Sequence, residues 1–283
     1  MIEAKEIEGL VRELPAAEAF ARLEHRFGVL PLLEAFFAPS PEVEKAAACR
    51  GALGLFTPTP EPGWGTAVEG ELTAEGAVLR GEVRLPACDF DGALVLADFA
   101  GGERRLAWVA ARPGAPGWLV LREVEVGSGL LSRPLTLPEL LRRIEEYAGV
   151  WALAAAVVAH EGVRALRRAA RTTVRQGAPF SSSQWVALGI AEVEIEAELA
   201  LSAARRNLAS EPRSGDLATA VAAAGILAAV AARTAELRDQ AGLEELDGPL
   251  AGPMGGLSAF LGGPLALQNE LARSLGIGAE AAA

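Results

Sequence analysis

Cysteine and histidine are scarce in this chain of 283 residues, and their positions exclude several kinds of site. The two cysteines, Cys49 and Cys88, lie far apart and form no Cys-x-x-Cys pair and no Cys/His cluster. This spacing excludes a disulfide framework and predicts no zinc or other metal site. His25 and His160 have no neighbouring Ser, Cys or acid pattern of the kind that builds a catalytic triad. A reducing, cytoplasmic location fits the low cysteine content.

Aromatic residues and basic charge are also in short supply. Aromatic side chains make up 5% of the chain, with Tyr147 the single tyrosine, while hydrophobic residues make up 51%. This composition favours packed helices over a large β-sandwich. The formal net charge of −11 argues against a nucleic-acid partner, because phosphate binding requires a concentrated basic surface.

Long apolar runs are missing as well. The most apolar segments, residues 148–159 and 217–232, are shorter than the roughly 20 residues that a membrane-spanning helix needs. We therefore expect no membrane span and interpret both segments as buried helices. The charged start, Met1 to Glu6, has no apolar core of the kind found in signal peptides.

The spacing of apolar residues divides the first half of the chain into two parts. Residues 1–54 are predicted to be a short helical region, since apolar residues recur every three or four positions and Ser40-Pro41 predicts a further helix that extends to about Gly51. Residues 55–135 begin with a Pro- and Gly-rich segment and then alternate. The alternation predicts a small antiparallel sheet or barrel, with strands at 67–72, 77–83, 93–97, 105–110 and 117–121.

Residues 136–283 are predicted to form a four-helix bundle. Thr136 and Glu139 make a capping box that opens a long helix, which we expect to end near Arg175. Further helices are expected at 182–209, 216–240 and 264–275. Short connections between long consecutive helices are typical of an up-down bundle.

The joint between the first two helices of this bundle carries a local turn signal. Gly177 tolerates a positive φ and Pro179 blocks continuation of the preceding helix. Ser181 is expected to cap the next helix, with Gln184 at its third position. The joint therefore has a purely structural interpretation.

Four segments in order resemble motifs of the acyl-CoA dehydrogenase family. Residues 60–66, Pro-Glu-Pro-Gly-Trp-Gly-Thr, resemble that family's Thr-Glu-Pro-x-x-Gly-Ser loop, and 42–45 resemble the helix before it. Residues 79–82 together with 94–95 resemble its β-hairpin, and Gly177-Ala178-Pro179-Phe180 followed by Gln184 resembles its Gly-x-Pro-Ile/Leu turn. The resemblance covers residues 41 to 275.

This resemblance implies a fold and a cofactor. The expected fold is mainly α with a small central β domain: short N-terminal helices, a middle antiparallel β section and a C-terminal four-helix bundle. The implied activity is FAD-dependent α,β-desaturation of an acyl thioester, as an oxidoreductase acting on CH–CH bonds. The residues carried over as FAD-binding by the resemblance are Thr66, Arg175, Gln176, Gln184, Gln240 and Gly242.

The catalytic base is the least well-defined part of the resemblance. Removal of the α-proton requires a carboxylate beside the acyl pocket. In the family this carboxylate follows a Gln-x-x-Gly-Gly segment, and here Gln240 and Gly242 are followed by Glu244 and Glu245, which are candidates by position. The loop at 250–263 contains no acid, and Glu270 is expected on the solvent-exposed face of the last helix.

Several departures from the family pattern leave two hypotheses open. The N-terminal helical region is short, and Thr173 and Gln176 replace the Arg and Phe that the family places at the turn. The first hypothesis is a divergent enzyme of this family that binds FAD. The second is a catalytically degenerate structural subunit of a heteromeric acyl-CoA dehydrogenase, in which FAD is held only together with a partner subunit.

The resemblance also implies partners. These are an acyl-CoA or a carrier-bound acyl thioester as substrate, and a homo-oligomer or a hetero-oligomer with a paralogous acyl-CoA dehydrogenase. An electron acceptor flavoprotein belongs to the same expectation.

Overall fold

The computed structural model describes residues 4–55, 68–85, 90–110, 118–175, 177–209 and 216–241. The chain divides into two compact units. The bundle unit comprises residues 1–16 and 148–254, and the sheet unit comprises 17–147 and 255–283. The helix expected at 264–275 lies outside the described residues.

Short helices precede the sheet, as the apolar spacing predicts. They are α1 (Ala4–Glu13), α2 (Ala16–Leu23), the π-helix η1 (Glu24–Val29), α3 (Leu30–Phe36) and α4 (Pro41–Ala48). Ser40 caps α4, because its Oγ accepts a hydrogen bond from the Val43 N–H at 3.2 Å. The expected extension of this helix to Gly51 is wrong: the backbone becomes extended at Cys49, and Gly51 begins a strand.

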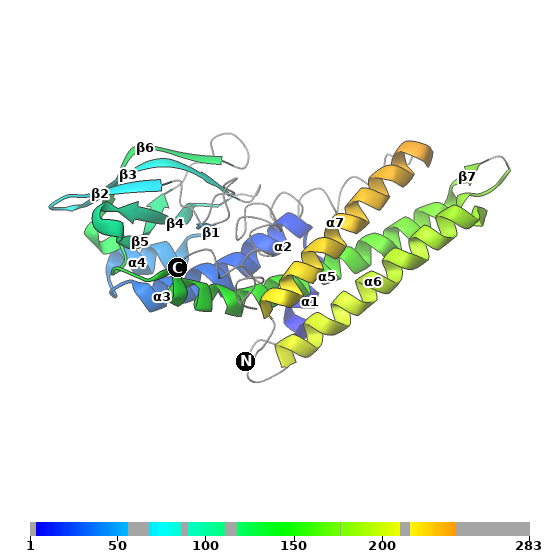
Figure 1. Ribbon diagram of the computed structural model, residues 1–283, viewed down its shortest axis with the longest axis horizontal. Coiled ribbons are helices and arrows are strands. Elements are labelled where there is room, and N and C mark those ends of the chain that lie inside the picture. The colour runs from blue at the N-terminus through cyan, green and yellow to red at the C-terminus, as the bar shows by residue number, and fades with distance from the viewer. Residues whose placement is uncertain are drawn as a thin grey trace, which may run out of the picture. The chain divides into compact units, whose positions relative to one another are not determined.

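The sheet contains the five strands that alternation predicts and one that it misses. The strands are β1 (Gly51–Gly54), β2 (Val68–Leu72), β3 (Gly76–Arg84), β4 (Gly92–Phe99), β5 (Arg104–Ala110) and β6 (Trp118–Gly127). Strand β1 is buried along its whole length, so its sequence does not alternate. Figure 1 shows β2, β3 and β6 side by side.

The sheet is mixed, which corrects the antiparallel arrangement expected from the sequence. Strand β4 pairs with β1 and β2 in parallel and with β5 in antiparallel. The sequence does not reveal the parallel pairing of β1 with β4. Strand β1 follows helix α4 and is not joined to β4 by a hairpin turn, which would have indicated an antiparallel pair. The inward-facing residues of β3, β4 and β5, such as Leu79, Val95 and Ala107, build the core of this unit.

The long helix α5 (Leu137–Thr172) begins as the capping box predicts. The Glu139 carboxylate accepts from the Thr136 N–H at 2.9 Å, and Thr136 Oγ1 lies 3.4 Å from the Glu139 N–H. All residues from 147 to 159 are buried. A helix that is apolar on every face is buried on every face, which explains the continuous apolar run there.

Two further helices, α6 (Gln184–Ala209) and α7 (Asp216–Ala241), complete the described part of the bundle. Between α5 and α6 the chain forms a tight hairpin of β7 (Val174–Arg175) and β8 (Ala178–Pro179), and Gly177 adopts the predicted positive φ of +81°. The expected capping role of Ser181 is wrong, because residues 180–182 form a 3₁₀ turn and Gln184 is the first residue of α6. Figure 1 shows α5 and α6 running alongside each other up to β7.

By length and composition alone, two described helical segments could cross a membrane: Leu137–Thr172 and Ala218–Glu236. In the first, 78% of the apolar window is buried within the structure. That degree of burial is typical of the core helix of a folded domain.

The π-helix η1 brings a buried carboxyl group to the free edge of β1. Glu24 is 5% exposed, and its Oε1 accepts a hydrogen bond from the Leu53 N–H at 2.5 Å. Its neighbour His25 accepts from the Gly51 N–H through Nδ1 at 3.1 Å. Burial raises the pKa of Glu24 to about 8 and lowers the pKa of His25. Both groups therefore favour their neutral forms in the folded protein.

We expect Glu24 to make stability fall as pH rises. Its pKa is higher in the folded protein than the ordinary 4.5, so between about 4.5 and about 8 the folded state binds a proton that the unfolded state has lost. Stability should decrease across this window by up to about 1.4 kcal/mol per pH unit. Urea unfolding at pH 5, 6.5 and 8 should show this decrease in the wild type and a flatter profile in Glu24→Gln. The exposed Glu34→Gln on α3 is the control, and a Glu24→Gln profile parallel to the wild type would contradict the assignment.

Candidate functional site

Most of the site residues expected from the sequence lie outside the described residues. Their proposed roles stay predictions, and they are Thr66, Gln176, Gly242, Glu244 and Glu245. Three others can be placed on the backbone. Arg175 ends β7, Gln184 begins α6 with an exposed side chain, and Gln240 is the penultimate residue of α7. Gln184 and Gln240 thus belong to the two helices that form a groove.

This groove between α6 and α7 has a volume of about 640 Å³. Its aromatic wall is Trp185, and the Arg233 guanidinium lies 4.3 Å from the centre of the Trp185 ring. Arg233 also pairs with Glu236, with Nη1 2.5 Å from the carboxylate. Gly189 leaves room for this arginine, because a Cβ at position 189 would lie 2.0 Å from its Nη2. Arg233 is therefore engaged on two sides.

The groove is acidic. Glu192, Glu196 and Glu236 line it, against the single cation Arg233. A flavin pyrophosphate carries negative charge and needs unpaired cations or N–H donors. The described residues of this groove do not fit that group, because their one guanidinium is already paired and stacked. Glu192 and Glu196 are both exposed.

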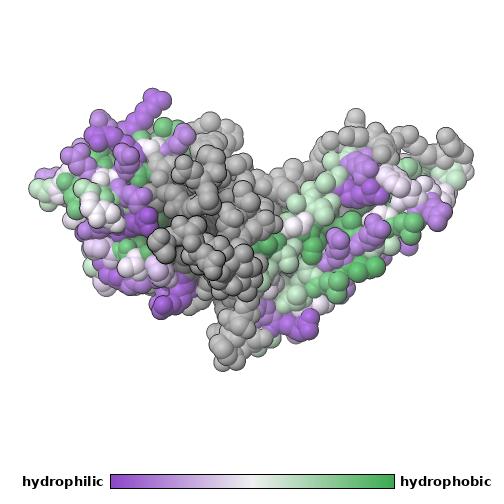
Figure 2. Space-filling model, in the orientation of Figure 1, coloured by the Kyte–Doolittle hydropathy of each residue, from purple (hydrophilic) through white to green (hydrophobic). Residues whose placement is uncertain are grey.

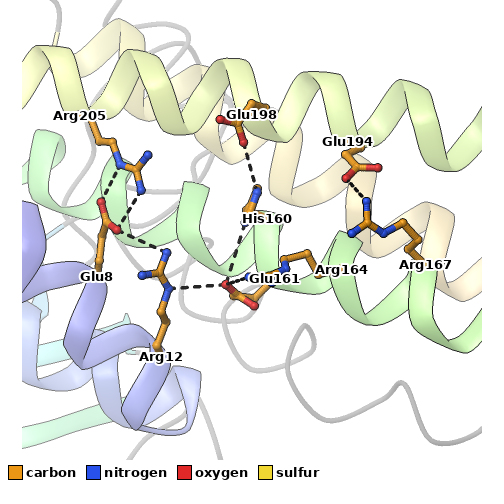
Figure 3. Close-up of polar contacts among 9 residues, drawn as sticks. All are labelled: Glu8, Arg12, His160, Glu161, Arg164, Arg167, Glu194, Glu198 and Arg205. Atoms are coloured by element: carbon orange, nitrogen blue, oxygen red, sulfur yellow. Dashed lines mark hydrogen bonds and ion pairs between the residues drawn. The ribbon is translucent and has the colours of Figure 1, made fainter.

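A second polar cluster joins α1, α5 and α6 (Figure 3). At one end, the Glu8 carboxylate accepts from Arg205 Nε and Nη2 at 2.7 and 2.9 Å, and it pairs with Arg12 at 3.4 Å. Glu8 is only 8% exposed. The hydrogen bond from Arg205 is the main reason that the pKa of Glu8 is lowered, although burial opposes it. Glu8 is thus a charged group held between two helices.

The same cluster continues along α5. Glu161 pairs with Arg12 at 3.5 Å and with Arg164 at 3.3 Å. His160 Nε2 lies 3.2 Å from Glu198 of α6, so its contact is with a carboxylate of the neighbouring helix. Figure 3 shows these side chains pointing toward one another across α5 and α6.

Sequence reasoning missed the role of Glu8, because Arg205 lies 197 positions away in the chain. On α6, Glu194 pairs with Arg167 of α5 at 2.6 Å, whereas Glu192 lines the groove shared with α7. Which glutamates of α6 face α5 and which face away from it is known only when the position of α5 beside α6 is known.

A surface pocket of about 860 Å³ opens beside this cluster. Val11, Leu14 and Val158 form part of its apolar wall, and Arg12, Glu161 and Arg164 form its polar side. Because Glu161 pairs with both arginines, the pocket has little free positive charge. Among the described residues, no group of three or more His, Cys, Asp or Glu is placed to hold a metal ion.

Solved structures with this fold are numerous. FkbI, described as acting in biosynthesis of the methoxymalonyl extender unit of the FK520 polyketide, matches with a TM-score of 0.75 at 16% identity over 97% of this chain and 85% of its own. A glutaryl-CoA dehydrogenase from Mycobacterium smegmatis in complex with FADH2 matches with a TM-score of 0.64 at 16% identity, over 94% and 81%. The ChsE4–ChsE5 complex from Mycobacterium tuberculosis matches with a TM-score of 0.62 at 20% identity, over 92% and 80%.

These matches establish that the chain has a divergent acyl-CoA dehydrogenase-like fold, mainly helical with a central sheet. Identities of 16–20% are too low to carry more than the fold. No protein-family profile matches the chain, and no curated protein matches it in sequence.

We expect the Glu8–Arg205 pair to contribute to the stability of the bundle unit. Replacing Glu8 by Gln leaves Arg205 without its carboxylate, but the Arg205 side chain is 42% exposed and partly solvated. The expected loss is therefore about 1–2 kcal/mol in the free energy of unfolding, measured by urea denaturation at pH 7. Because the pKa of Glu8 is lowered, this contribution should disappear as pH falls below about 4.5.

The exposed pair Glu18–Arg22 supplies the matched control. Its atoms lie 2.6 Å apart, yet both side chains are at least one third exposed. Glu18→Gln should change stability by less than about 0.5 kcal/mol. Equal effects of Glu8→Gln and Glu18→Gln would show that the buried pair has no special role.

Proposed function

We propose that this chain is an acyl-CoA dehydrogenase-type subunit that serves the α,β-desaturation of an acyl thioester. The observation that carries the proposal is a shared fold over 92–97% of the chain, which includes both the sheet and the bundle. A likeness limited to the bundle would be weak support, since helical bundles serve many functions. The hairpin at Gly177 and the start of α6 at Gln184 add a second point of support, because the family's turn signature lies there.

The remaining parts of the proposed activity follow from the family resemblance. The thioester is carried by CoA or by a carrier protein, and the electron acceptor is a flavoprotein. The cytoplasmic location is proposed from the low cysteine content. Glu244 or Glu245 would remove the α-proton. When bound, FAD would supply the hydride acceptor, and Thr66, Arg175, Gln176, Gln184, Gln240 and Gly242 are the proposed contacts.

A second candidate function is favoured by the acidic groove. A chain whose α6–α7 groove presents Glu192, Glu196 and Glu236 with Arg233 already engaged is poorly suited to hold a pyrophosphate. The second candidate is therefore a structural subunit that stabilises a catalytic paralogue. In that assembly FAD is bound only together with the partner subunit.

Flavin content separates the two candidates. The catalytic candidate predicts that the chain purified alone retains flavin, absorbs visible light and loses that absorbance when an acyl-CoA is added. Glu244→Gln or Glu245→Gln, whichever removes the catalytic base, should then slow this bleaching at least about a hundredfold, while the amount of bound flavin stays the same. A colourless chain that binds no added FAD would reject the catalytic candidate.

Co-expression tests the structural candidate. A catalytic acyl-CoA dehydrogenase paralogue expressed together with this chain should yield a stable complex that contains flavin. The measurements are the stoichiometry of the two chains and the flavin per complex. Failure of the paralogue to co-purify, with a colourless chain as well, would reject both candidates.

A further inference from the structure

Helix α6 has an exposed apolar stripe in addition to its buried face. Large hydrophobic side chains on the stripe are 43–64% exposed, and they are Trp185, Leu188, Ile195 and Leu199. Positions 185, 188, 192, 195 and 199 follow the alternating three- and four-residue spacing of a helix-pairing seam. The stripe extends for about 21 Å along the helix. Figure 2 shows hydrophobic residues reaching the surface of the helices among hydrophilic ones.

Among the described residues, α7 reaches this stripe through Arg233, which stacks on Trp185, while Leu188, Ile195 and Leu199 stay more than half exposed. The inner face of α6 is formed by other residues, among them Val186, Ile190, Val193 and Ala197, which are all buried. These positions point to the side of the helix nearly opposite the stripe, at 100° per residue. A contiguous exposed apolar surface of this kind marks an interaction site.

Charge at the stripe indicates what kind of partner fits. Glu192 occupies the central seam position and Glu196 flanks it, and both are exposed. Among the described residues neither has a basic partner, whereas Glu194 and Glu198 on the inner side pair with Arg167 and His160. Carboxylates within and beside an apolar seam select a partner with Arg or Lys opposite them.

A second copy of this chain is a poor occupant. Pairing two α6 helices in antiparallel orientation so that their apolar stripes coincide places Glu192 of one copy against Glu192 of the other. Like charges at such contacts disfavour association. A shifted antiparallel pair with Arg206 opposite Glu192 would leave Trp185 and Leu188 facing positions beyond Ala209, where α6 ends.

We propose that the α6 stripe docks a helix of a different chain, one with apolar residues at seam spacing and basic residues opposite Glu192 and Glu196. This inference rests on the proposed function, since it gives the chemistry of the partner subunit. The ChsE4–ChsE5 complex, an assembly of two different proteins, includes a chain of the same fold. Trp185 is the expected anchor, because an aromatic side chain beside a groove buries a large area on binding.

Two synthetic helical peptides test the charge requirement. Both have the same leucine seam over about three heptads, and their flanking positions are either all Arg or all Glu. Fluorescence anisotropy with the purified chain should show the basic peptide binding at least about tenfold more tightly than the acidic one. Added salt should reduce this difference.

Variants of the chain locate the binding. The pair Leu188→Asp and Ile195→Asp should weaken binding of the basic peptide at least about tenfold, whereas Leu72→Asp, an equally exposed leucine on β2, should leave it unchanged. The pair Glu192→Arg and Glu196→Arg should invert the preference, so that the acidic peptide binds more tightly. Circular dichroism and urea midpoints check that each variant is folded.

The proposal is overturned if neither peptide binds, if both bind equally, or if the charge-reversed chain keeps the original preference. It is also overturned if sedimentation shows the chain alone to be a dimer that Ile195→Asp dissociates, since the occupant is then a second copy. The peptide experiment uses no flavin and no substrate. If the chain binds the basic peptide but fails every flavin test, the docking proposal is supported and the catalytic candidate is rejected. If the chain binds flavin but neither peptide, the docking proposal is rejected and the catalytic candidate is supported.

Discussion

The complete burial of α5 between residues 147 and 159 is the constraint on which the bundle depends. An α-helix with no solvent-facing side must be surrounded, and its neighbours must therefore supply apolar faces. Helix α6 passes this segment with its C-terminal half, as the contact between His160 and Glu198 shows, and its buried residues there include Leu201, Ala204 and Leu208. Helix α7 packs against α6 and buries mostly small residues such as Ala220 and Ala224. Small side chains allow helices to approach closely, which explains why α7 is so rich in alanine.

The same arrangement distributes the charges of the bundle unit. Charged residues on the side of α6 that faces α5 or α1 have partners: Glu194 with Arg167, Glu198 with His160, and Arg205 with Glu8. Those on the outer side, Glu192 and Glu196, are exposed beside large apolar residues. This asymmetry connects the fold to function, because it separates the residues that hold the unit together from those available to another molecule.

Much of the fold is predictable from the sequence, while the candidate site is not. Capping by Ser40 and Thr136, the positive φ at Gly177 and five of the strands follow from local rules. The errors in the predicted elements occur where local sequence patterns conflict with one another or give no signal. Strand β1 is buried on both faces, so its sequence has no alternation of apolar and polar residues. Ser181 lies inside a 3₁₀ turn, and Ser183 is the residue directly before the first residue of α6. The division into residues 1–54, 55–135 and 136–283 stays a prediction.

The sequence by itself determined the succession of short helices, later strands and long helices, without β1, and the motifs that resemble the acyl-CoA dehydrogenase family, because both depend on neighbours within a few positions. The tertiary structure alone decided which side of α6 is free, where β1 pairs, and that Glu8 and Glu24 are buried carboxyl groups with opposite pKa shifts. These properties depend on partners that are distant in sequence. Glu8 faces a guanidinium 197 positions away, whereas Glu24 is buried and accepts a hydrogen bond from the backbone N–H of Leu53.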